Sequence, residues 1–393
     1  MGAGGGCQLK PNDGRQSEQD CLVVGASFAG LASAIALARA GLRVTVVEKK
    51  TDPGAKLHTT GIIVKDAVDQ IALLDALPMQ SVHRIPGVRL YAPNLRHVDL
   101  EAPGYYFLAT DTPAVMRWLA AEAEKAGATL ACGTAFTGAR RLQSGFAAEG
   151  LGTTRFLIGA DGPRSRVAGA LGLGSSTRFL AGVEYEYGGA SIAVPDRLHC
   201  FVNRHLAPGY IGWVLAGVTG VQAGLARRVG APGAFRPDEA MDAFLARIAP
   251  VIDLRGMAPT GVRAGLIPCG GVVHPVATSR ALLVGDAAGI VSPVTAGGIH
   301  TALKHGFAAG NAVADFLQGR AGDPSGWFVR SYPKFRMKRF LRFLFDHFQS
   351  DVAFDCLLAT WPMRYAARLV YFHHKGVFDP TAGSERGLAV PRT

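Results

Sequence analysis

Apolar and polar positions near the start of the chain predict a strand, a helix and a second strand. Residues 22–24 form a short apolar run of the kind found in buried parallel strands. A glycine-containing turn follows at residues 25–30, and an alanine-rich helix is predicted at about residues 31–40, closed by Gly41. Residues 43–48 make the second strand. Residues 21–38 are continuously small or apolar, but their glycines and serines favour this interpretation over a membrane span.

The turn at residues 25–30 has the features of a dinucleotide-binding turn. Gly25 permits a tight turn, Gly30 lets the helix pack close to the strand, and the helix N-terminus offers N–H groups to a pyrophosphate. Glu48 follows Gly25 by 23 residues, where a carboxylate can accept hydrogen bonds from a ribose. Ser27 replaces the middle glycine of the G-x-G-x-x-G pattern, and its small size and hydroxyl group are compatible with binding. An ordinary strand–helix junction is the weaker interpretation.

Two later segments each lead from a predicted strand into a loop that begins with an aspartate. Residues 156–163 carry Asp161, and residues 281–289 carry Asp286. In open α/β folds such positions lie at the carboxyl edge of the sheet, where ligands bind. Asp286 can reach a ribityl hydroxyl, and the glycines at 297–298, which open a helix, present N–H groups to a flavin or its phosphates.

Together the glycine turn, the Ala-Asp-Gly at 160–162 and the Gly-Asp-Ala-Ala at 285–288 resemble an FAD-binding group of flavoproteins. That group includes aromatic hydroxylases, halogenases and geranylgeranyl reductases, and the similarity covers roughly residues 20–310. The resemblance implies FAD as the cofactor. It also implies NAD(P)H or a reduced electron carrier as the donor, without a separate Rossmann site for NAD(P)H.

Within this group the chain resembles the geranylgeranyl reductase family. Aromatic hydroxylases usually have a histidine after Gly-Asp-Ala-Ala, whereas this chain has Gly289. Residues 285–295 and 265–268 look like the reductases, and residues 208–225 are similar to their Tyr-x-Trp-x-Phe-Pro region. That region lines the isoprenoid cavity in the family, so Tyr210 and Trp213 are expected to contact the substrate. The alternative is that both aromatic residues belong to the core.

The chain departs from the reductase pattern at the expected substrate end. Tyr210 and Trp213 have the spacing Tyr-x-x-Trp, and Leu-Ala at 215–216 replaces Phe-Pro. Residues 56–61 lack the cysteine that the family often has there, and residues 111–116 lack an arginine. These departures do not affect the FAD-binding motifs, so FAD is still expected as the cofactor. The identity of the substrate stays open.

No residue is marked by its sequence context as a general acid. His58 and His300 lie on segments expected near the flavin, although a structural role is the more common outcome for a histidine. The catalytic and substrate candidates are His58, Thr60, Tyr210, Trp213 and His300. The candidates for FAD binding are Gly25, Ala26, Ser27, Ala29, Gly30, Glu48, Lys49, Phe136, Asp161, Gly162, Gly285, Asp286, Pro293, Ala296, Gly297, Gly298 and Ile299.

Length and composition predict two joined domains of the α/β class. A chain of 393 residues exceeds the size of a single core, and 49% hydrophobic with 18% charged residues excludes general disorder. The expected architecture is a Rossmann-type FAD-binding domain, an inserted antiparallel β-sheet substrate domain and a C-terminal helical region. The FAD-binding domain is assigned residues 20–75, 111–175 and 276–320, the substrate domain residues 76–110 and 176–275, and the helical region residues 321–393. Residues 1–19 are predicted to be a flexible tail without the apolar core of a signal peptide.

Cysteine usage and net charge restrict the location and the partners. The six cysteines have no CxxC pair and no metal-ligand spacing, which indicates thiols in a reducing, cytoplasmic compartment and no metal site. A formal charge of +11 predicts an anionic partner. The chain has none of the recognised nucleic-acid-binding motifs, so cofactor phosphates and an anionic membrane surface explain the charge better.

The basic residues gather in a segment near the C-terminus, where they alternate with apolar ones. On a helix, Met337, Phe340, Leu341 and Leu344 would share one face flanked by Lys and Arg. Residues 330–345 therefore form either a helix that caps the flavin domain or an interfacial helix on an anionic membrane. A second aromatic stretch at 357–372 could roof a hydrophobic tunnel.

These observations predict an FAD-dependent oxidoreductase that reduces C=C bonds of an apolar or isoprenoid substrate, a hydrophobic small molecule or lipid, by hydride transfer from reduced flavin. One alternative is an FAD-dependent monooxygenase of a hydrophobic or aromatic substrate. Another is a non-catalytic protein that carries flavin for a partner.

Overall fold

A mainly parallel sheet forms the centre of one half of the protein. The computed structural model describes residues 18–372, so most of the predicted tail and residues 373–393 of the predicted helical region lie outside the described residues. The strand order is β17 (Ala277–Thr278), β18 (Ala281–Leu283), β11 (Gly152–Gly159), β1 (Glu18–Val24), β2 (Val44–Glu48) and β8 (Thr129–Cys132). β10 (Phe146–Ala148) pairs with β11 and with β9 (Ala139–Arg141). Glu18 and Gln19, which the sequence analysis placed in the tail, belong to β1.

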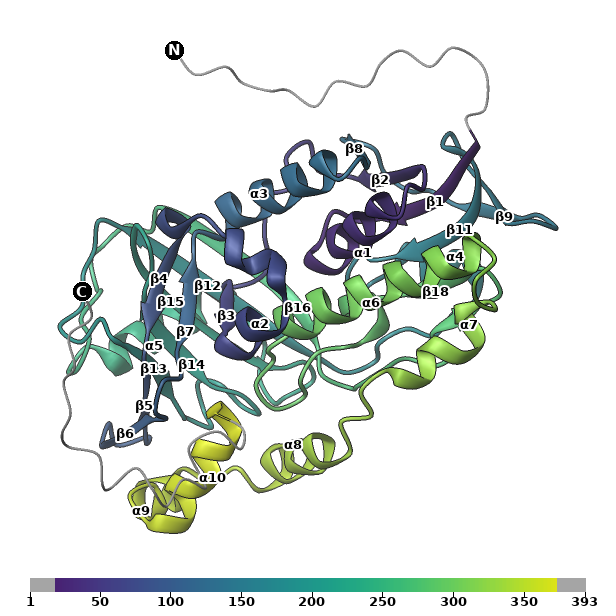
Figure 1. Cartoon of the computed structure of the whole chain (residues 1–393). Coiled ribbons are helices and arrows are strands. Elements are labelled where there is room, and N and C mark those ends of the chain that lie inside the picture. The colour runs from purple at the N-terminus through teal and green to yellow at the C-terminus, as the bar shows by residue number, and fades with distance from the viewer. Residues whose placement is uncertain (1–17, 373–393) are drawn as a thin grey trace, which may run out of the picture.

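Two helices pack together against this sheet and fix the position of the glycine turn. Figure 1 shows α1 (Phe28–Arg39) and α6 (Ile299–Leu317) side by side, although they are far apart in the sequence. The Ser33 hydroxyl donates to the carbonyl oxygen of Gly306 at 2.9 Å, which joins the two helices inside the core. α3 (Thr112–Lys125) also packs on α1. α1 begins three residues before the predicted start, because the Ser27 side chain caps it.

A largely antiparallel sheet forms the other half. Its strand order is β16 (Gly261–Pro268), β12 (Phe179–Gly188), β15 (Gly220–Arg228), β14 (Gly212–Ala216), β13 (Arg197–Phe201), β5 (Gly87–Tyr91) and β6 (His97–Glu101). Only the β13–β5 pair in this sheet of the described chain is parallel. The apolar face of α5 (Pro237–Ile248), with Met241 and Phe244, packs into a core beside this sheet. These two sheets give the α/β class with an antiparallel sheet that the sequence predicts.

Smaller elements connect the two halves. β3 (Ile62–Val64), β7 (Phe107–Thr110) and β4 (Val82–Ile85) form a separate antiparallel sheet. α2 (Lys65–Gln70) follows β3, and α4 (Arg166–Leu171) follows β11. Single 3-10 turns occur at Ala72–Ala76, Met79–Ser81, Gly285–Ala288 and Phe328–Ser331.

The C-terminal helices lie along the antiparallel sheet rather than on the parallel one. Figure 1 shows α8 (Arg336–Phe348), α9 (Asp351–Leu357) and α10 (Trp361–Phe372) below that sheet, after the short α7 (Pro324–Trp327). Phe372 anchors α10, since its ring lies 5.4 Å from that of Tyr105 and 5.9 Å from that of Phe107. Between residues 18 and 372, no helix combines the length and the apolar character that crossing a membrane requires.

Candidate functional site

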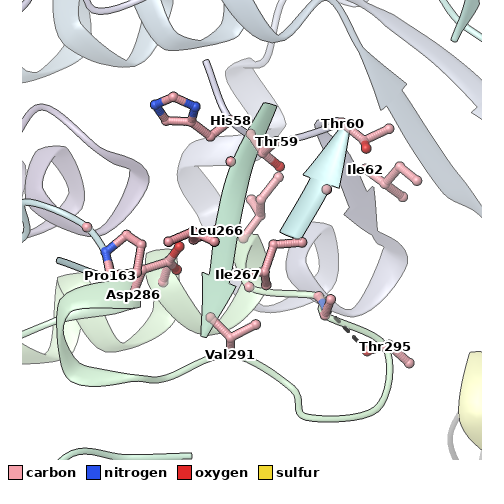
Figure 2. A pocket seen from close by; sticks show the side chains of 18 of the residues that line it. His58, Thr59, Thr60, Ile62, Pro163, Leu266, Ile267, Asp286, Val291 and Thr295 are labelled. Carbon is pink, nitrogen blue, oxygen red and sulfur yellow. Dashed lines mark hydrogen bonds between the residues drawn. The ribbon is translucent and has the colours of Figure 1, made fainter. Parts of the chain in front are cut away.

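One large cavity runs between the two halves of the protein. It has a volume of about 1310 Å³ and extends from the turn after β1 to the C-terminal helices. This volume exceeds that of a typical pocket for one small ligand, roughly 300–1,000 Å³. Figure 2 shows part of the wall, where Asp286 and Val291 come from the loop after β18, Leu266 and Ile267 from β16, and Thr60 from the loop before β3.

Most of the residues singled out from the sequence line this cavity. They are His58, Thr60, Tyr210 and Trp213, and, for the cofactor, Gly25, Ala26, Ser27, Ala29, Glu48, Lys49, Phe136, Asp161, Gly162, Gly285, Asp286, Ala296, Gly297, Gly298 and Ile299. Gly30, Pro293 and His300 are not part of the lining. His300 instead lies at the start of α6 with its ring Nε2 3.3 Å from the Gln70 side chain, so a role in proton transfer has no support from its position.

The two end glycines of the turn are required for different reasons. Gly25 has φ +104°, and a Cβ there would lie 2.5 Å from the carbonyl oxygen of Ala160. A Cβ on Gly30 would lie 2.0 Å from the carbonyl oxygen of Gly25, so Gly30 acts through packing and not through ligand contact. The Ser27 hydroxyl donates to Ala160 O at 3.0 Å and accepts from the Gly30 amide at 3.2 Å. Serine at the middle position therefore stabilises the turn from within.

Glu48 ties the second strand to this turn. Its Oε2 accepts from the Ala26 amide at 2.9 Å, and its Oε1 accepts from the Lys50 amide at 3.0 Å. The side chain is buried yet lines the cavity. A carboxylate oriented by two main-chain amides keeps free lone pairs, which suit the hydroxyls of a ribose.

Asp161 lines the cavity and accepts several hydrogen bonds within its own loop. Its carboxylate accepts from the Ser165 hydroxyl and the Arg166 amide, both at 2.6 Å, and from the Val167 amide at 3.2 Å. These bonds shape the start of α4 and use most of the carboxylate's capacity. Asp161 therefore supports the wall of the cavity more than it offers a charge to a ligand.

Asp286 is the carboxylate best placed to meet a ligand. Removal from bulk water raises the pKa of Asp286 to about 6, and no hydrogen bond from a described residue offsets this effect. It stands in the cavity wall beside Pro163 (Figure 2) and close to Gly298. An acceptor without a protein donor fits a hydroxyl-bearing ligand such as the ribityl chain of FAD, so this end of the cavity fits FAD.

Two cationic residues at the nucleotide end were not found from the sequence. Lys50 Nζ donates to the carbonyl oxygens of Pro53 at 3.1 Å and Ala55 at 3.0 Å, and burial lowers the pKa of Lys50. The Arg166 guanidinium donates to Phe136 O at 3.5 Å. Both line the cavity and bring positive charge to the place where the FAD phosphates are expected. Lys50 could have been found from the sequence by its position two residues after Glu48, the acidic end of the strand.

At the other end, a buried carboxylate accepts hydrogen bonds from two of the candidate residues. Glu184 on β12 is 3% exposed, and its Oε2 accepts from Thr60 Oγ1 at 2.6 Å and from Trp213 Nε1 at 2.8 Å. Tyr210 donates its hydroxyl to Thr295 O at 2.6 Å. Tyr210 and Trp213 thus have polar partners at the cavity wall, and both also pack in a small apolar cluster with Leu180 and Ala226.

Glu184 and Arg263 are site residues that sequence analysis missed. They are register partners on β12 and β16, and Arg263 NH1 donates to Thr59 O at 2.7 Å and to Thr112 Oγ1 at 3.2 Å. The Arg263 guanidinium also pairs with Glu186. The pattern Glu-x-Glu at 184–186 within an apolar strand was the available signal, but strand register cannot be read from one sequence.

His58 is exposed, and its ring Nδ1 lies 2.5 Å from Ala264 O on β16. It lines the cavity, but this bond uses one ring nitrogen to attach its loop to the strand.

The remaining length of the cavity is almost entirely apolar. One wall comes from β5, β13 and β14 and the other from the C-terminal helices, which agrees with the predicted roof over a tunnel. The wall on the sheet side includes Leu90, Leu198, Cys200, Val202 and Ile211, and that on the helix side includes Leu341, Leu344, Phe345, Phe348, Phe354, Leu358, Met363, Ala367, Val370 and Tyr371. Such a lining suits a long hydrocarbon chain.

Known proteins with related sequences and folds agree with this geometry. The family described as FAD binding domain matches residues 18–209 and 270–336. Digeranylgeranylglycerophospholipid reductase 1 of Methanothermobacter thermautotrophicus is 27% identical over 315 residues, which cover 76% of this chain and 77% of that protein. A geranylgeranyl bacteriochlorophyll reductase-like protein from Thermoplasma acidophilum has a TM-score of 0.78 at 20% identity, covering 90% of this chain and 96% of that one.

A probable FAD-dependent monooxygenase from Pseudomonas aeruginosa also shares the fold, with a TM-score of 0.66 at 16% identity over 88% of this chain and 100% of that one. The predicted fold class, the FAD cofactor and the resemblance to geranylgeranyl reductases are confirmed by these comparisons. The assignment of single residues to roles and the domain boundaries stay predictions.

Proposed function

The chain belongs to the FAD binding domain family, and from this premise we propose that it reduces carbon–carbon double bonds of an isoprenoid lipid. The names of the curated relatives support this substrate class. The observation that carries the proposal is the continuity of the cavity, in which an end lined by the candidate FAD-binding residues opens into a long apolar end. A monooxygenase of a small aromatic substrate has no need of a tunnel of this length.

Residues at one end of the cavity would bind the cofactor, and residues at the other end would bind the substrate. Glu48, Asp286 and the amides of the glycine turn would hold FAD, which when reduced supplies a hydride to the substrate. NAD(P)H or a reduced carrier would supply the electrons. The apolar walls would align the isoprenoid chain and exclude water, while Tyr210 and Trp213 would mark the point at which chain and cofactor meet.

An anaerobic single-turnover experiment tests the reductase function. The protein with FAD, reduced by dithionite, is mixed with a geranylgeranyl lipid, and the product is examined by mass spectrometry. A gain of two hydrogens for each reduced double bond is expected, without oxygen. Incorporation of ¹⁸O from labelled oxygen in an aerobic reaction would support the monooxygenase alternative. A reduced flavin that neither alkene nor oxygen reoxidises would support the flavin-carrier alternative.

A pair of variants tests the tunnel. Ala367 lies in the tunnel wall, whereas Ala359 is exposed and lies outside the lining. Ala367→Trp should raise KM for a long prenyl chain at least tenfold and leave FAD content unchanged. Ala359→Trp should change neither. Equal kinetics of the two variants would contradict the tunnel assignment.

We also propose that the outer face of the C-terminal helices lies on an anionic membrane. Met337, Phe340, Phe348, Val352 and Trp361 are between 56% and 75% exposed, which is unusual for large apolar side chains. The exposed basic residues nearby are Arg330, Lys334, Arg336 and Arg339. Arg342 does not belong with them as predicted, because it is buried and pairs with Asp346 at 2.7 Å.

The same helices connect this face to the tunnel. Leu341, Leu344 and Phe348 are at least 36% exposed and also line the cavity, so the apolar patch borders its mouth. A lipid could then enter from the bilayer without crossing water. Sedimentation with vesicles tests this arrangement: binding to vesicles containing phosphatidylglycerol and weaker binding to pure phosphatidylcholine are expected. Equal recovery in the supernatant with both would contradict it.

A further inference from the structure

Glu184 occupies a position where a carboxylate is costly. It lies in the middle of β12, 3% exposed, between an apolar core and the cavity. Both of its hydrogen-bond partners, Thr60 Oγ1 and Trp213 Nε1, contact Oε2. Its Oε1 is buried and has no hydrogen-bond partner within residues 18–372. Burying a charged oxygen without a hydrogen-bond partner is much more costly than burying a neutral carbonyl oxygen in the same way.

The neighbouring arginine does not neutralise this carboxyl directly. Arg263 NH1 is 3.8 Å from Glu184 Oε1, too far for a hydrogen bond, and its donors point to Thr59 O, Thr112 Oγ1 and Glu186. Burial raises the pKa of Glu184, with Glu186 adding to the effect, while Thr60, Arg263 and Trp213 oppose it. Burial therefore makes the neutral carboxyl easier to form here than at the protein surface.

Thr60 connects the buried carboxyl to the cavity. Its hydroxyl is half-buried in the wall (Figure 2), 2.6 Å from Glu184 Oε2, and Arg263 fixes the adjacent main chain. When Glu184 carries a proton on Oε2, the carboxyl donates to Thr60 Oγ1, and the threonine proton is free to turn toward the cavity. Two oxygens at this distance can exchange a proton without rearrangement.

We propose that Glu184 and Thr60 form the proton relay of the reduction, with Glu184 as the proton store and Thr60 as the group that delivers the proton to the substrate. This inference rests on the proposed reductase function. In the balanced step, one alkene carbon receives a hydride and its two electrons from the reduced flavin, which becomes oxidised. The other carbon receives a proton from Thr60 Oγ1, which takes the proton of Glu184. Arg263 stabilises the resulting carboxylate, and water reprotonates it after product release.

The first test measures the protonation state without activity. The infrared spectrum of the protein with bound FAD at neutral pH should contain the C=O band of a protonated carboxylic acid. Glu184→Gln should remove this band, and Glu239→Gln, which removes an exposed carboxyl on α5 that pairs with Arg236, should keep it. A wild-type spectrum without the band, or a band of unchanged intensity in Glu184→Gln, overturns the relay.

The second test separates proton delivery from electron transfer. In anaerobic single turnovers, Glu184→Gln and Thr60→Val should slow alkene reduction by about 100-fold or more, the usual scale of general acid catalysis. Oxidation of the same reduced protein by ferricyanide, which requires no carbon protonation, should stay at the wild-type rate. Thr60→Ser should restore alkene reduction, and Glu239→Gln, the surface control, should stay within about threefold of wild type.

The pH dependence provides a further check on the same proteins. The wild-type alkene rate should fall as pH rises through the raised pKa of Glu184, and this fall should be absent in Glu184→Gln. The charged groups around Glu184 are Arg263 on β16 and Glu186 on β12, while β14 and β15 contribute Trp213 and the neutral Gln222. Wild-type alkene rates in both Glu184→Gln and Thr60→Val would overturn the relay. A wild type that reduces no alkene would instead overturn the proposed function, and the carboxyl band would still report on Glu184.

Discussion

The Glu48 carboxylate at the end of β2 accepts a hydrogen bond of 2.9 Å from the Ala26 amide in the turn after β1. One residue therefore shapes the turn expected to hold the FAD phosphates and is also in position to bind a ribose. The other carboxylate oxygen is fixed by the Lys50 amide. The Glu48 side chain thus connects the end of β2 to the turn that follows β1.

Glu48→Ala should weaken FAD binding by about 100-fold. The change removes an acceptor for the ribose and leaves two main-chain amides without their charged partner, a loss of roughly 3 kcal/mol. Fluorescence titration of FAD into the apoprotein measures the effect. Glu122→Ala, which removes a surface partner of Lys125, is the control and should bind FAD like wild type. Undiminished affinity of Glu48→Ala would contradict the assignment of the ribose site.

Gly30→Ala should reduce both stability and FAD content. An added Cβ would lie 2.0 Å from the carbonyl oxygen of Gly25, so α1 would have to move away from the turn, at a cost of about 3 kcal/mol. Urea unfolding and the flavin absorbance of the purified protein measure the two effects. Gly169→Ala places a Cβ into open space on α4 and should leave both unchanged. Equal behaviour of the two variants would be inconsistent with the packing role of Gly30.

The cofactor end could be predicted from the sequence because its determinants are local. The strand at residues 22–24, the glycines at 25 and 30 and the acid at 48 lie within one βαβ unit, so their spacing alone indicates their arrangement. Even there, the sequence did not distinguish Asp161, which holds its own loop, from Asp286, whose carboxylate accepts no hydrogen bond from the described residues. Both follow a strand and precede a glycine or alanine, and only the three-dimensional contacts separate them.

The substrate end depends on long-range strand pairing and was predicted only in part. Glu184 meets Thr60 across 124 residues of sequence and Arg263 across a strand register that no local pattern encodes. The C-terminal helix was recognised by its periodicity, but burial of Arg342 depends on its ion pair with Asp346, four residues away on α8. The sequence therefore did not show which basic residues of the helix are exposed and which are buried in ion pairs.

Replacing Met337, Phe340 and Phe348 by serine should reduce binding to phosphatidylglycerol vesicles at least tenfold. These side chains are 69%, 56% and 71% exposed, and transfer of each into a bilayer would contribute about 1.5–3 kcal/mol when complete. The matched control replaces Met79, Met257 and Val262, which are also exposed and belong to other parts of the chain. Sedimentation of both triple variants measures the difference. A similar loss in the control would show that general hydrophobicity, and not this face, determines the binding.

Asp286→Asn should stabilise the apoprotein at pH 8 but not near pH 4. Burial raises the pKa of Asp286 from its ordinary 3.8 to about 6, so the folded state binds the proton more tightly than the unfolded state does. The stability that this group contributes is complete below about pH 4 and is lost as pH rises through about 6, where the charged form must be buried. The free energy of unfolding of wild type should therefore fall relative to the variant by up to about 3 kcal/mol between these pH values. Urea unfolding of both apoproteins across this range measures the difference, and a difference that does not change with pH would refute a desolvated Asp286.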